Sequence, residues 1–202
     1  MSELKNFNKK VILASSSPRR KKILQEMGID FEIIPSDYEE VLDNFDFTYE
    51  KIEELAYNKA KDVFNKLNSS SFTLDASIIL SADTVVVLED KILCKPEDRQ
   101  DAISMLKQLS GKKHSVVTSI CIINPAKAEK HVLSTTSYIE FECLSEELIL
   151  NYIEEFNPLD KAGSYGIQEL PEGFVKGIEG SFYNIIGLCP NALNEILKEL
   201  IE

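Results

Sequence analysis

The stretch KVILASSSPRR, residues 10–20, joins an apolar run to three serines, a proline and two arginines. The apolar run at 10–14 predicts a short buried strand. Ser17 is suited to be the N-cap of a helix, and Pro18 is suited to be its first residue. Residues 31–34 then predict a second strand. The chain therefore opens with a strand, a polar loop, a helix and a strand, an order typical of α/β proteins.

The rest of the chain continues this alternation without a long linker or an internal repeat. Apolar residues at helical spacing predict helices, and short runs rich in β-branched residues predict strands. The expected helices cover residues 49–67, 98–109 and 145–156 and begin again at 190, and the expected strands cover 77–80, 84–88, 91–93, 115–123, 132–141 and 182–186. We predict a single α/β domain over residues 1–202, with a mixed central sheet flanked by helices.

The chain is acidic, because its 202 residues include 22 Lys and Arg against 34 Asp and Glu, a formal net charge of −12. This charge gives no general attraction to nucleic acid or to an anionic membrane, so a bound polyanion needs a local group of cations. No apolar run approaches the roughly 18 residues of a membrane span, and the first ten residues are polar. Four cysteines without a C-x-x-C pair fit neither a disulfide-rich domain nor a zinc site. We expect a cytosolic protein without nucleic-acid or membrane partners.

The first candidate site is the polar loop and helix start at residues 15–20. Backbone N–H groups at a helix N-terminus, the hydroxyls of Ser15 and Ser17 and the guanidinium groups of Arg19 and Arg20 are suited to bind phosphate. The simpler interpretation is a capped helix with two exposed arginines.

A second candidate is Asp83, which follows the expected strand at 77–80, together with Lys95 across the expected hairpin. A carboxylate there is suited to bind a divalent metal or to accept a proton from water. The alternative is an aspartate that merely ends a strand.

A third candidate is the loop at residues 160–168. Its glycines allow close approach of a ligand to the backbone, Lys161 adds a positive charge, and the amide of Gln168 is able to pair with a base edge. An ordinary surface loop is the alternative.

Two further features are an acidic stretch at residues 36–40 and Lys59. The acidic stretch offers oxygen ligands for a metal but is also consistent with a solvated loop. Lys59 lies on the apolar face of its expected helix, where it either points into a cleft or extends its ammonium to solvent. Cations beside glycine-containing loops and isolated carboxylates favour a site for a phosphorylated small molecule and a metal.

Nearly the whole chain resembles the Maf family of nucleoside triphosphate pyrophosphatases. The matching stretches are LASSSPRR at 13–20, LAYNKA at 55–60, ADTVV at 82–86, KP at 95–96, LSGKKHSV at 109–116, DKAGSYGIQ at 160–168 and GL at 187–188. The chain departs from the family pattern at ELPE, residues 169–172, where the family has small residues and glycines, and at GLCP, residues 187–190, which is one residue longer. The resemblance implies that these changes affect the rim of the base pocket rather than the phosphate site.

The resemblance implies the elongated mixed sheet of Maf and inosine triphosphate pyrophosphatase proteins and hydrolysis of a nucleoside triphosphate to the monophosphate and pyrophosphate, a house-cleaning reaction of nucleotide pools. It implies that Asp83 accepts the proton of the attacking water and that Glu40 and Asp83 bind a divalent cation, Mg or Mn. The phosphate-binding residues that it implies are Ser15, Ser17, Arg19, Arg20, Lys59, Lys95 and Lys161. It also implies a homodimer.

Arg19, Thr84 and Gln168 match the subgroup that prefers dTTP and UTP over 7-methyl-GTP. The altered residues 169–172 suggest that CTP or modified pyrimidine nucleotides are additional substrates. Three alternatives remain at this point: a non-catalytic nucleotide-binding regulator of cell division, a pyrophosphatase that prefers 7-methyl-GTP, and an enzyme of the inosine triphosphate pyrophosphatase type.

Overall fold

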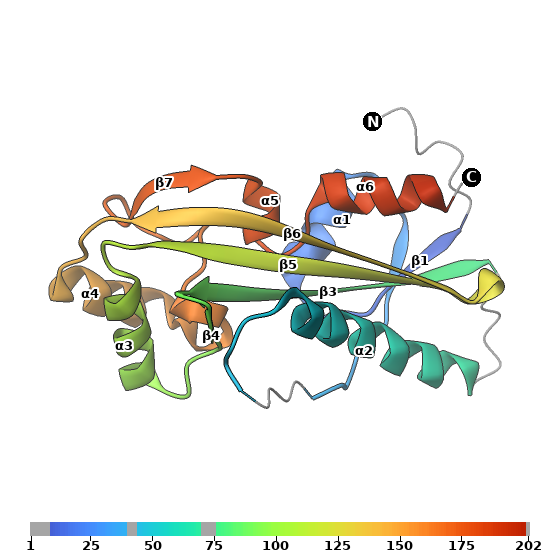
Figure 1. Ribbon diagram of the computed structural model, residues 1–202, viewed down its shortest axis with the longest axis horizontal. Helices are drawn as coiled ribbons and strands as arrows, with labels where there is room; N and C mark the ends of the chain where they lie inside the picture. Colours follow the sequence, from blue (N-terminus) through green and yellow to red (C-terminus); the bar gives the residue numbers. More distant parts are fainter. Residues whose placement is uncertain (1–8, 40–43, 70–75, 201–202) are drawn as a thin grey trace.

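A seven-stranded mixed sheet forms the frame of the molecule in the computed structural model, which describes residues 9–39, 44–69 and 76–200 (Figure 1). The strands are β1 Lys10–Leu13, β2 Phe31–Ile33, β3 Ser77–Leu88, β4 Lys91–Leu93, β5 Lys113–Asn124, β6 Glu129–Phe141 and β7 Val175–Glu179. The α-helices are α1 Pro18–Glu26, α2 Tyr49–Asn68, α3 Arg99–Leu109, α4 Glu146–Phe156, α5 Phe182–Ile185 and α6 Pro190–Glu199, and short 3₁₀ turns include η2 Pro125–Lys127, η3 Pro158–Asp160 and η4 Ala162–Ser164. The strand order is β2-β1-β3-β5-β6-β7, and β4 pairs with β3.

The opening of the chain confirms the expected strand, loop, helix and strand. β1 pairs in parallel with both β2 and β3, whereas all other strand pairs are antiparallel. The Ser17 hydroxyl caps α1 by accepting a hydrogen bond from the N–H of Arg20, and Pro18 is the first helical residue. The cap fixes where the loop after β1 ends and the helix begins.

Three long antiparallel strands, β3, β5 and β6, run along most of the length of the molecule (Figure 1). The sequence predicted a break in β3 near Asp83, and this prediction was wrong. β5 pairs with β3 without interruption from residue 79 to residue 87. Because the hydrogen bonds of this ladder continue through Asp83, the carboxylate lies in the middle of a strand and not at its end.

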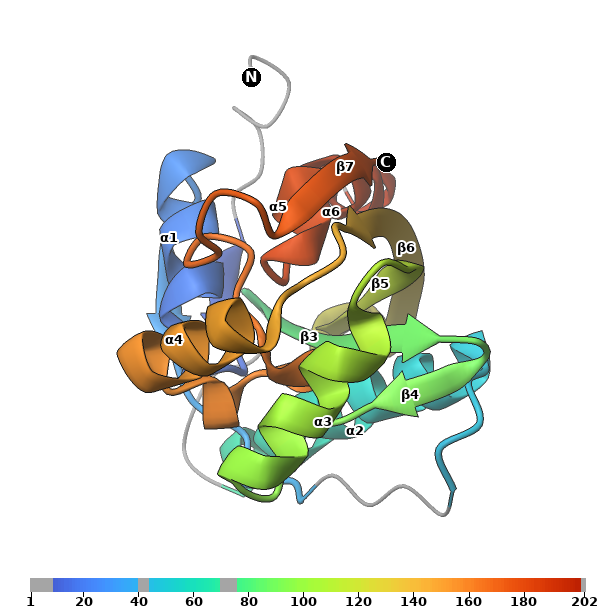
Figure 2. The ribbon, with the colours of Figure 1, turned by 90° about the vertical axis from the view of Figure 1, so that its left-hand side faces the viewer.

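Helices cover both faces of the sheet. Ile23 and Leu24 of α1 and Leu193 of α6 pack on one face, over alternate residues of β3 such as Leu80. On the opposite face, α2 packs against Ile79 of β3. The helices α3 and α4 lie together at one end of the sheet (Figures 1 and 2). There, residues of α4 pack in a buried cluster that includes Phe141 and Phe174. Within the described residues, no helix has the length and apolar character to cross a bilayer.

The segment near the C-terminus differs from the sequence prediction. Residues 182–186 were expected to be the last strand, but Phe182–Ile185 is the short helix α5, capped by the Ser181 hydroxyl. The last strand is β7, in a segment that contains Gly177 and that was not among the expected strands. β7 pairs with the edge of β6, so neighbouring strand context and not its own composition determines its structure.

Candidate active site

A cleft lies beside the part of β3 that has no neighbouring strand on one edge. On that edge β1 pairs with residues 77–80 and β4 pairs with residues 86–88, while β5 covers the opposite edge. Among the described strands, none pairs with residues 81–85 on the first edge. The cleft is thus beyond the carboxyl end of β1, a usual place for ligands in open α/β sheets.

The cleft has a volume of about 430 Å³ and is lined by residues of all three candidate sites and by Lys59. It is lined by the predicted residues Ser15, Ser17, Arg19, Arg20, Lys59, Asp83, Thr84, Lys95, Lys161 and Gln168. Residues that the sequence analysis did not assign a role, such as Tyr38 and Ile167, complete its walls. The other predicted metal ligand, Glu40, lies outside the described residues.

Asp83 forms an ion pair with Lys59 of α2. Asp83 is only 4% exposed, and the side chain of Lys59 is largely buried as well. The neighbouring Ser81 donates a hydrogen bond of 2.5 Å to the carbonyl oxygen of Ala56, which fixes α2 against the same face of β3. Lys59 therefore points into the cleft, and the structure favours that interpretation over an ammonium extended to solvent.

Arg20 connects three walls of the cleft. Its Nε donates to the carbonyl oxygen of Gly187 at 2.9 Å, one terminal nitrogen donates to the Ser15 hydroxyl at 3.1 Å, and the other donates to the Thr84 hydroxyl at 3.2 Å. Gly187 adopts a φ of 116°, a backbone conformation that side chains disfavour. The planar guanidinium thus sets the positions of the loop after β1, the middle of β3 and the turn after α5.

A buried chain of hydrogen bonds continues behind Thr84. Thr84 and Thr118 of β5 are 2.9 Å apart at their hydroxyl oxygens, and Thr118 donates to the carbonyl oxygen of Asn184 at 2.8 Å. The Asn184 amide donates to the Val116 carbonyl and to the Ser137 hydroxyl. The sequence analysis did not identify Thr118 or Asn184. The available signal was the polar pair Thr118-Ser119 within the otherwise apolar stretch at 116–123, and it gave no indication of the partner of Thr118.

The third group of residues surrounds Lys161, whose side chain is buried. Its ammonium lies 2.8 Å from a carboxylate oxygen of Asp160 and 3.2 Å from one of Glu169. The expectation that the altered residues 169–172 leave the phosphate-binding residues untouched was therefore wrong for Glu169. Burial alone would raise the pKa of Asp160, but the hydrogen bond and charge of Lys161, with a smaller contribution from Arg19, lower it below its usual value. Asp160 is therefore a carboxylate at neutral pH.

The loop that carries Lys161 packs tightly on β3. Gly163 has a φ of 65°, and a Cβ atom at this position would lie 2.9 Å from a methyl carbon of Val86. Its N–H donates to the carbonyl oxygen of Cys94, near Lys95. A glycine is required here both by the backbone conformation and by the close contact. The other three candidates lie at the rim of the cleft: Arg19 is half-buried, and Lys95 and Gln168 are exposed.

The cationic side chains of the cleft are suited to bind a polyanion, and the Asp83 carboxylate is suited to bind a metal cation beside it. Among the described residues, no three carboxylate, imidazole or thiol side chains gather into a complete metal site. The carboxylate of Asp83 is nonetheless suited to be one ligand of a hard divalent cation. Mg²⁺ binds one or two carboxylates and completes its coordination shell with substrate phosphate oxygens and water. Asp83 would hold the cation from the protein side, next to the place where the cationic side chains favour phosphate.

Comparisons with known proteins match nearly the whole chain. The family model for Maf-like proteins matches residues 10–200. A protein of Ruminiclostridium cellulolyticum named dTTP/UTP pyrophosphatase is 44% identical over 193 residues, which cover 95% of this chain and 96% of that protein. A protein of the same name from Caldicellulosiruptor saccharolyticus is also 44% identical and covers 95% of each chain. A human protein named probable bifunctional dTTP/UTP pyrophosphatase/methyltransferase is 39% identical, with 98% of this chain and 32% of the human protein covered.

The family model spans the sheet and both helical layers, and the relatives align over nearly the full length of the chain. The aligned region includes all the described walls of the cleft. The chain therefore belongs to the family of Maf-like proteins.

Proposed function

We propose that this protein is a nucleoside triphosphate pyrophosphatase that hydrolyses dTTP and UTP to the monophosphate and pyrophosphate. The observation that carries the proposal is the buried carboxylate of Asp83 in a cleft with five cationic side chains, within a chain of net charge −12. Because the net negative charge repels polyanions, a local cluster of cations in this chain indicates a site that binds one. The names of the relatives at 44% identity supply the same activity.

The phosphates are held, in this proposal, by Arg19, Lys95 and Lys161 together with the N-terminus of α1. The first turn of α1 and the preceding loop, which carries Ser15 and Ser17, line the cleft, and backbone N–H groups at a helix start favour phosphate. Several fixed cations stabilise the charge that moves onto the departing pyrophosphate when the α-phosphorus is attacked. Arg20 and Lys59 contribute charge, and they also hold Thr84 and Asp83 in position.

Asp83 is the proton acceptor for the attacking water in this mechanism. In its ion pair with Lys59 it is a carboxylate, the form that accepts a proton. Burial restricts its movement and keeps bulk water from surrounding it. A divalent cation, Mg or Mn, would be held by Asp83, with Glu40 as the second expected ligand, and would supply charge stabilisation for the phosphoryl oxygens when bound.

We assign recognition of the base to Arg19, Thr84 and Gln168, so Arg19 has a role at both the phosphates and the base. Uracil and thymine present a carbonyl, an N–H and a second carbonyl along one edge, and an amide and a hydroxyl are able to pair with such an edge. The cationic ring of 7-methylguanine favours an aromatic face instead. We expect UTP and dTTP to be the better substrates, with CTP and modified pyrimidine nucleotides as additions.

A nucleotide panel with Mg²⁺ or Mn²⁺ tests the proposal. We expect pyrophosphate release from UTP and dTTP and a much lower kcat/KM for 7-methyl-GTP. The highest kcat/KM for 7-methyl-GTP would overturn the base assignment, and binding of all nucleotides without turnover would favour a non-catalytic nucleotide-binding protein. In this proposal residues 1–202 act as one pyrophosphatase domain, in a cytoplasmic homodimer, and sedimentation of the purified protein tests the oligomeric state.

A further inference from the structure

The carboxylate of Glu169 lies beside Lys161, a cation that binds substrate phosphate in the proposed function. This carboxylate lies 3.2 Å from the ammonium of Lys161, and the Lys161 side chain is only 9% exposed. The second carboxylate at this ammonium, Asp160, has a side chain that is 70% exposed, so it is well hydrated. Glu169 is the more enclosed of the two, with a side-chain exposure of 34%.

The backbone of residues 166–169 directs this carboxylate inward. The N–H of Glu169 donates to the carbonyl oxygen of Gly166 at 2.8 Å, which closes a turn. The N–H of Gly166 donates to the Tyr152 hydroxyl at 3.0 Å, which anchors the turn to α4. A Cβ atom at residue 166 would lie 2.9 Å from Glu169 Oε2 and 3.0 Å from Lys161 Cε. The absence of a side chain at Gly166 is what allows the two charged groups to meet.

Within the described part of the chain, one carboxylate oxygen of Glu169 lacks a hydrogen-bond donor. Glu169 Oε2 is buried and accepts no hydrogen bond from the described residues, although it faces the ammonium of Lys161. A buried carboxylate oxygen without a hydrogen bond is costly, so this arrangement contributes less than a well-formed ion pair. Phosphate oxygens, which carry more charge and more lone pairs, are stronger partners for the same ammonium.

We propose that Glu169 is an internal anion that occupies Lys161 while the cleft is empty and competes with the polyphosphate of the substrate for it. The inference rests on the proposed function and adds a residue that sets the affinity for phosphate. When the polyphosphate takes Lys161, the carboxylate loses its only charged partner in the described part of the chain and remains as a nearby like charge. Removing its charge should therefore strengthen polyphosphate binding.

The test is calorimetric binding of inorganic tripolyphosphate, without added metal, to the wild-type protein, Glu169→Gln and the matched control Glu172→Gln. Glu172 carries the same charge three residues later, is exposed and is not part of the cleft wall. We expect Glu169→Gln to bind about three- to tenfold more tightly, the size expected for one charge in a partly hydrated site. The control should change binding less than about twofold, because a distant exposed charge is screened. Glu169→Ala should change binding in the same direction as Glu169→Gln.

A double-mutant comparison tests whether Glu169 acts through Lys161. In a Lys161→Met background, Glu169→Gln should lose most of its effect, because the two residues are coupled. Unchanged or weaker tripolyphosphate binding by both folded Glu169 variants, or an equal gain in the Lys161→Met background, would overturn the inference. If the wild-type protein binds tripolyphosphate and responds in this way but hydrolyses no nucleotide, the proposed function fails while the competition stands.

Discussion

Asp83 and Thr84 are consecutive residues of β3, so their side chains point to opposite faces of the sheet. Asp83 faces α2 and its ion-pair partner Lys59, whereas Thr84 faces Arg20 and Thr118. Both border the same cleft because no strand covers this part of the β3 edge. The arrangement places the proposed proton acceptor and a proposed base-recognition residue one position apart.

Replacing Asp83 by asparagine should keep the fold and reduce kcat for UTP by roughly 10²–10⁴-fold, since the amide accepts no proton. Asparagine retains an oxygen that can accept a hydrogen bond from Lys59, so circular dichroism should show an unchanged fold. Pyrophosphate release under steady-state conditions measures the effect. Near-normal turnover by the folded variant would assign the proton acceptor to another carboxylate, and Glu40 would be the first to test.

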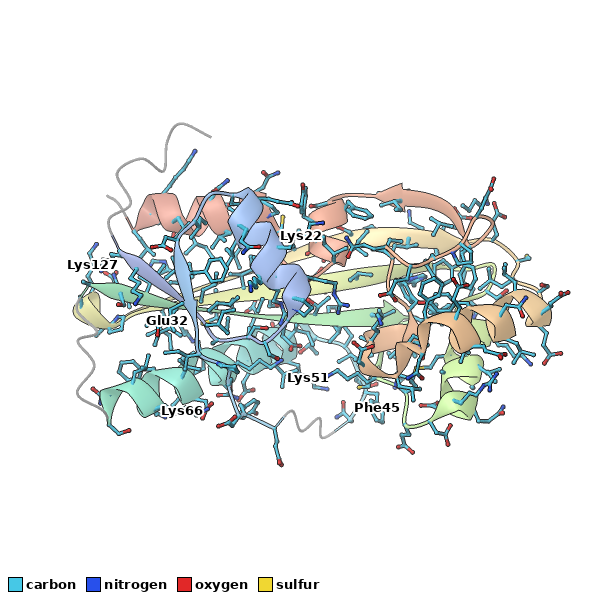
Figure 3. The ribbon with its side chains drawn as sticks, turned by 180° about the vertical axis from the view of Figure 1, so that it is seen from behind. Lys22, Glu32, Phe45, Lys51, Lys66 and Lys127 are labelled. Atoms are coloured by element: carbon cyan, nitrogen blue, oxygen red, sulfur yellow. The ribbon has the colours of Figure 1, made fainter. Side chains whose placement is uncertain are left out.

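At the scale of elements, the start of α1 performs a structural and a proposed binding role with the same residues. Ser17 caps the helix, while the preceding Ser15 hydroxyl accepts hydrogen bonds from the Ser17 N–H and from Arg20. Figure 3 shows α1, which carries the labelled Lys22, and α2, which carries the labelled Lys66, as separate helices of the fold. Residues 14–17 join β1 to α1 and line the cleft, so the cap also fixes this wall.

Ser17→Ala should lower the free energy of unfolding by about 1 kcal/mol, the usual loss for a missing N-cap. Ser16→Ala is the matched control, because Ser16 is an exposed serine of the same loop. Chemical denaturation of both variants measures the difference. Equal stability of the two variants would show that the Ser17 hydroxyl contributes nothing as a cap.

Thr118→Val should lower the free energy of unfolding by about 1–3 kcal/mol, because the Asn184 carbonyl and the Thr84 hydroxyl then lose a buried partner. The matched control is Thr135→Val at the paired position of β6, where the side chain is only half-buried. Since Thr84 loses a restraint, we also expect a higher KM for UTP in Thr118→Val. A Thr118 variant as stable and as active as the control would contradict a role for this chain of hydrogen bonds.

The sequence predicts elements well where local signals agree with tertiary structure, and less well elsewhere. The opening strand and helix are predicted by an apolar run, a cap and a proline, all of which act locally. The helix at 182–185 is not predicted by local signals, because its aromatic and β-branched residues favour a strand. Its cap at Ser181 and the hydrogen bonds of the buried Asn184 stabilise the helix only where it packs beside β5 and β6.

The same limit applies to the site. Cations and the carboxylate are visible as motifs, whereas the contact between Glu169 and Lys161 depends on a turn closed on Gly166 and is visible only in three dimensions.

At the scale of the whole molecule, an aromatic cluster packs at the end of the sheet that α3 and α4 cover, and it includes the titratable side chain of His114. His114 is buried, its Nε2 lies 2.8 Å from the Tyr165 hydroxyl, and its ring packs edge-on against Phe141. Burial lowers the pKa of His114 from 6.5 to about 4. Tyr165 also lines the cleft, so this core supports the loop that carries Lys161.

The lowered pKa of His114 predicts how stability depends on pH. Between pH 6.5 and about 4 the unfolded chain binds a proton at His114 and the folded protein does not. The free energy of unfolding should therefore keep the contribution of neutral His114 above pH 6.5 and lose up to about 3 kcal/mol as the pH falls towards 4. His114→Gln should have a smaller slope over this range than the wild-type protein. Identical slopes for the wild type and His114→Gln would contradict this assignment.

The central claim is that the cleft directs water to the α-phosphorus of a pyrimidine nucleoside triphosphate. Hydrolysis of UTP in water enriched in ¹⁸O, followed by mass spectrometry of the products, tests it most directly. The account predicts UMP and pyrophosphate as products, with one ¹⁸O atom in UMP and none in pyrophosphate. Label in pyrophosphate would place the attack on the β-phosphorus, and UDP with inorganic phosphate would place the cleavage at the bond between the β- and γ-phosphates; either result would contradict the account.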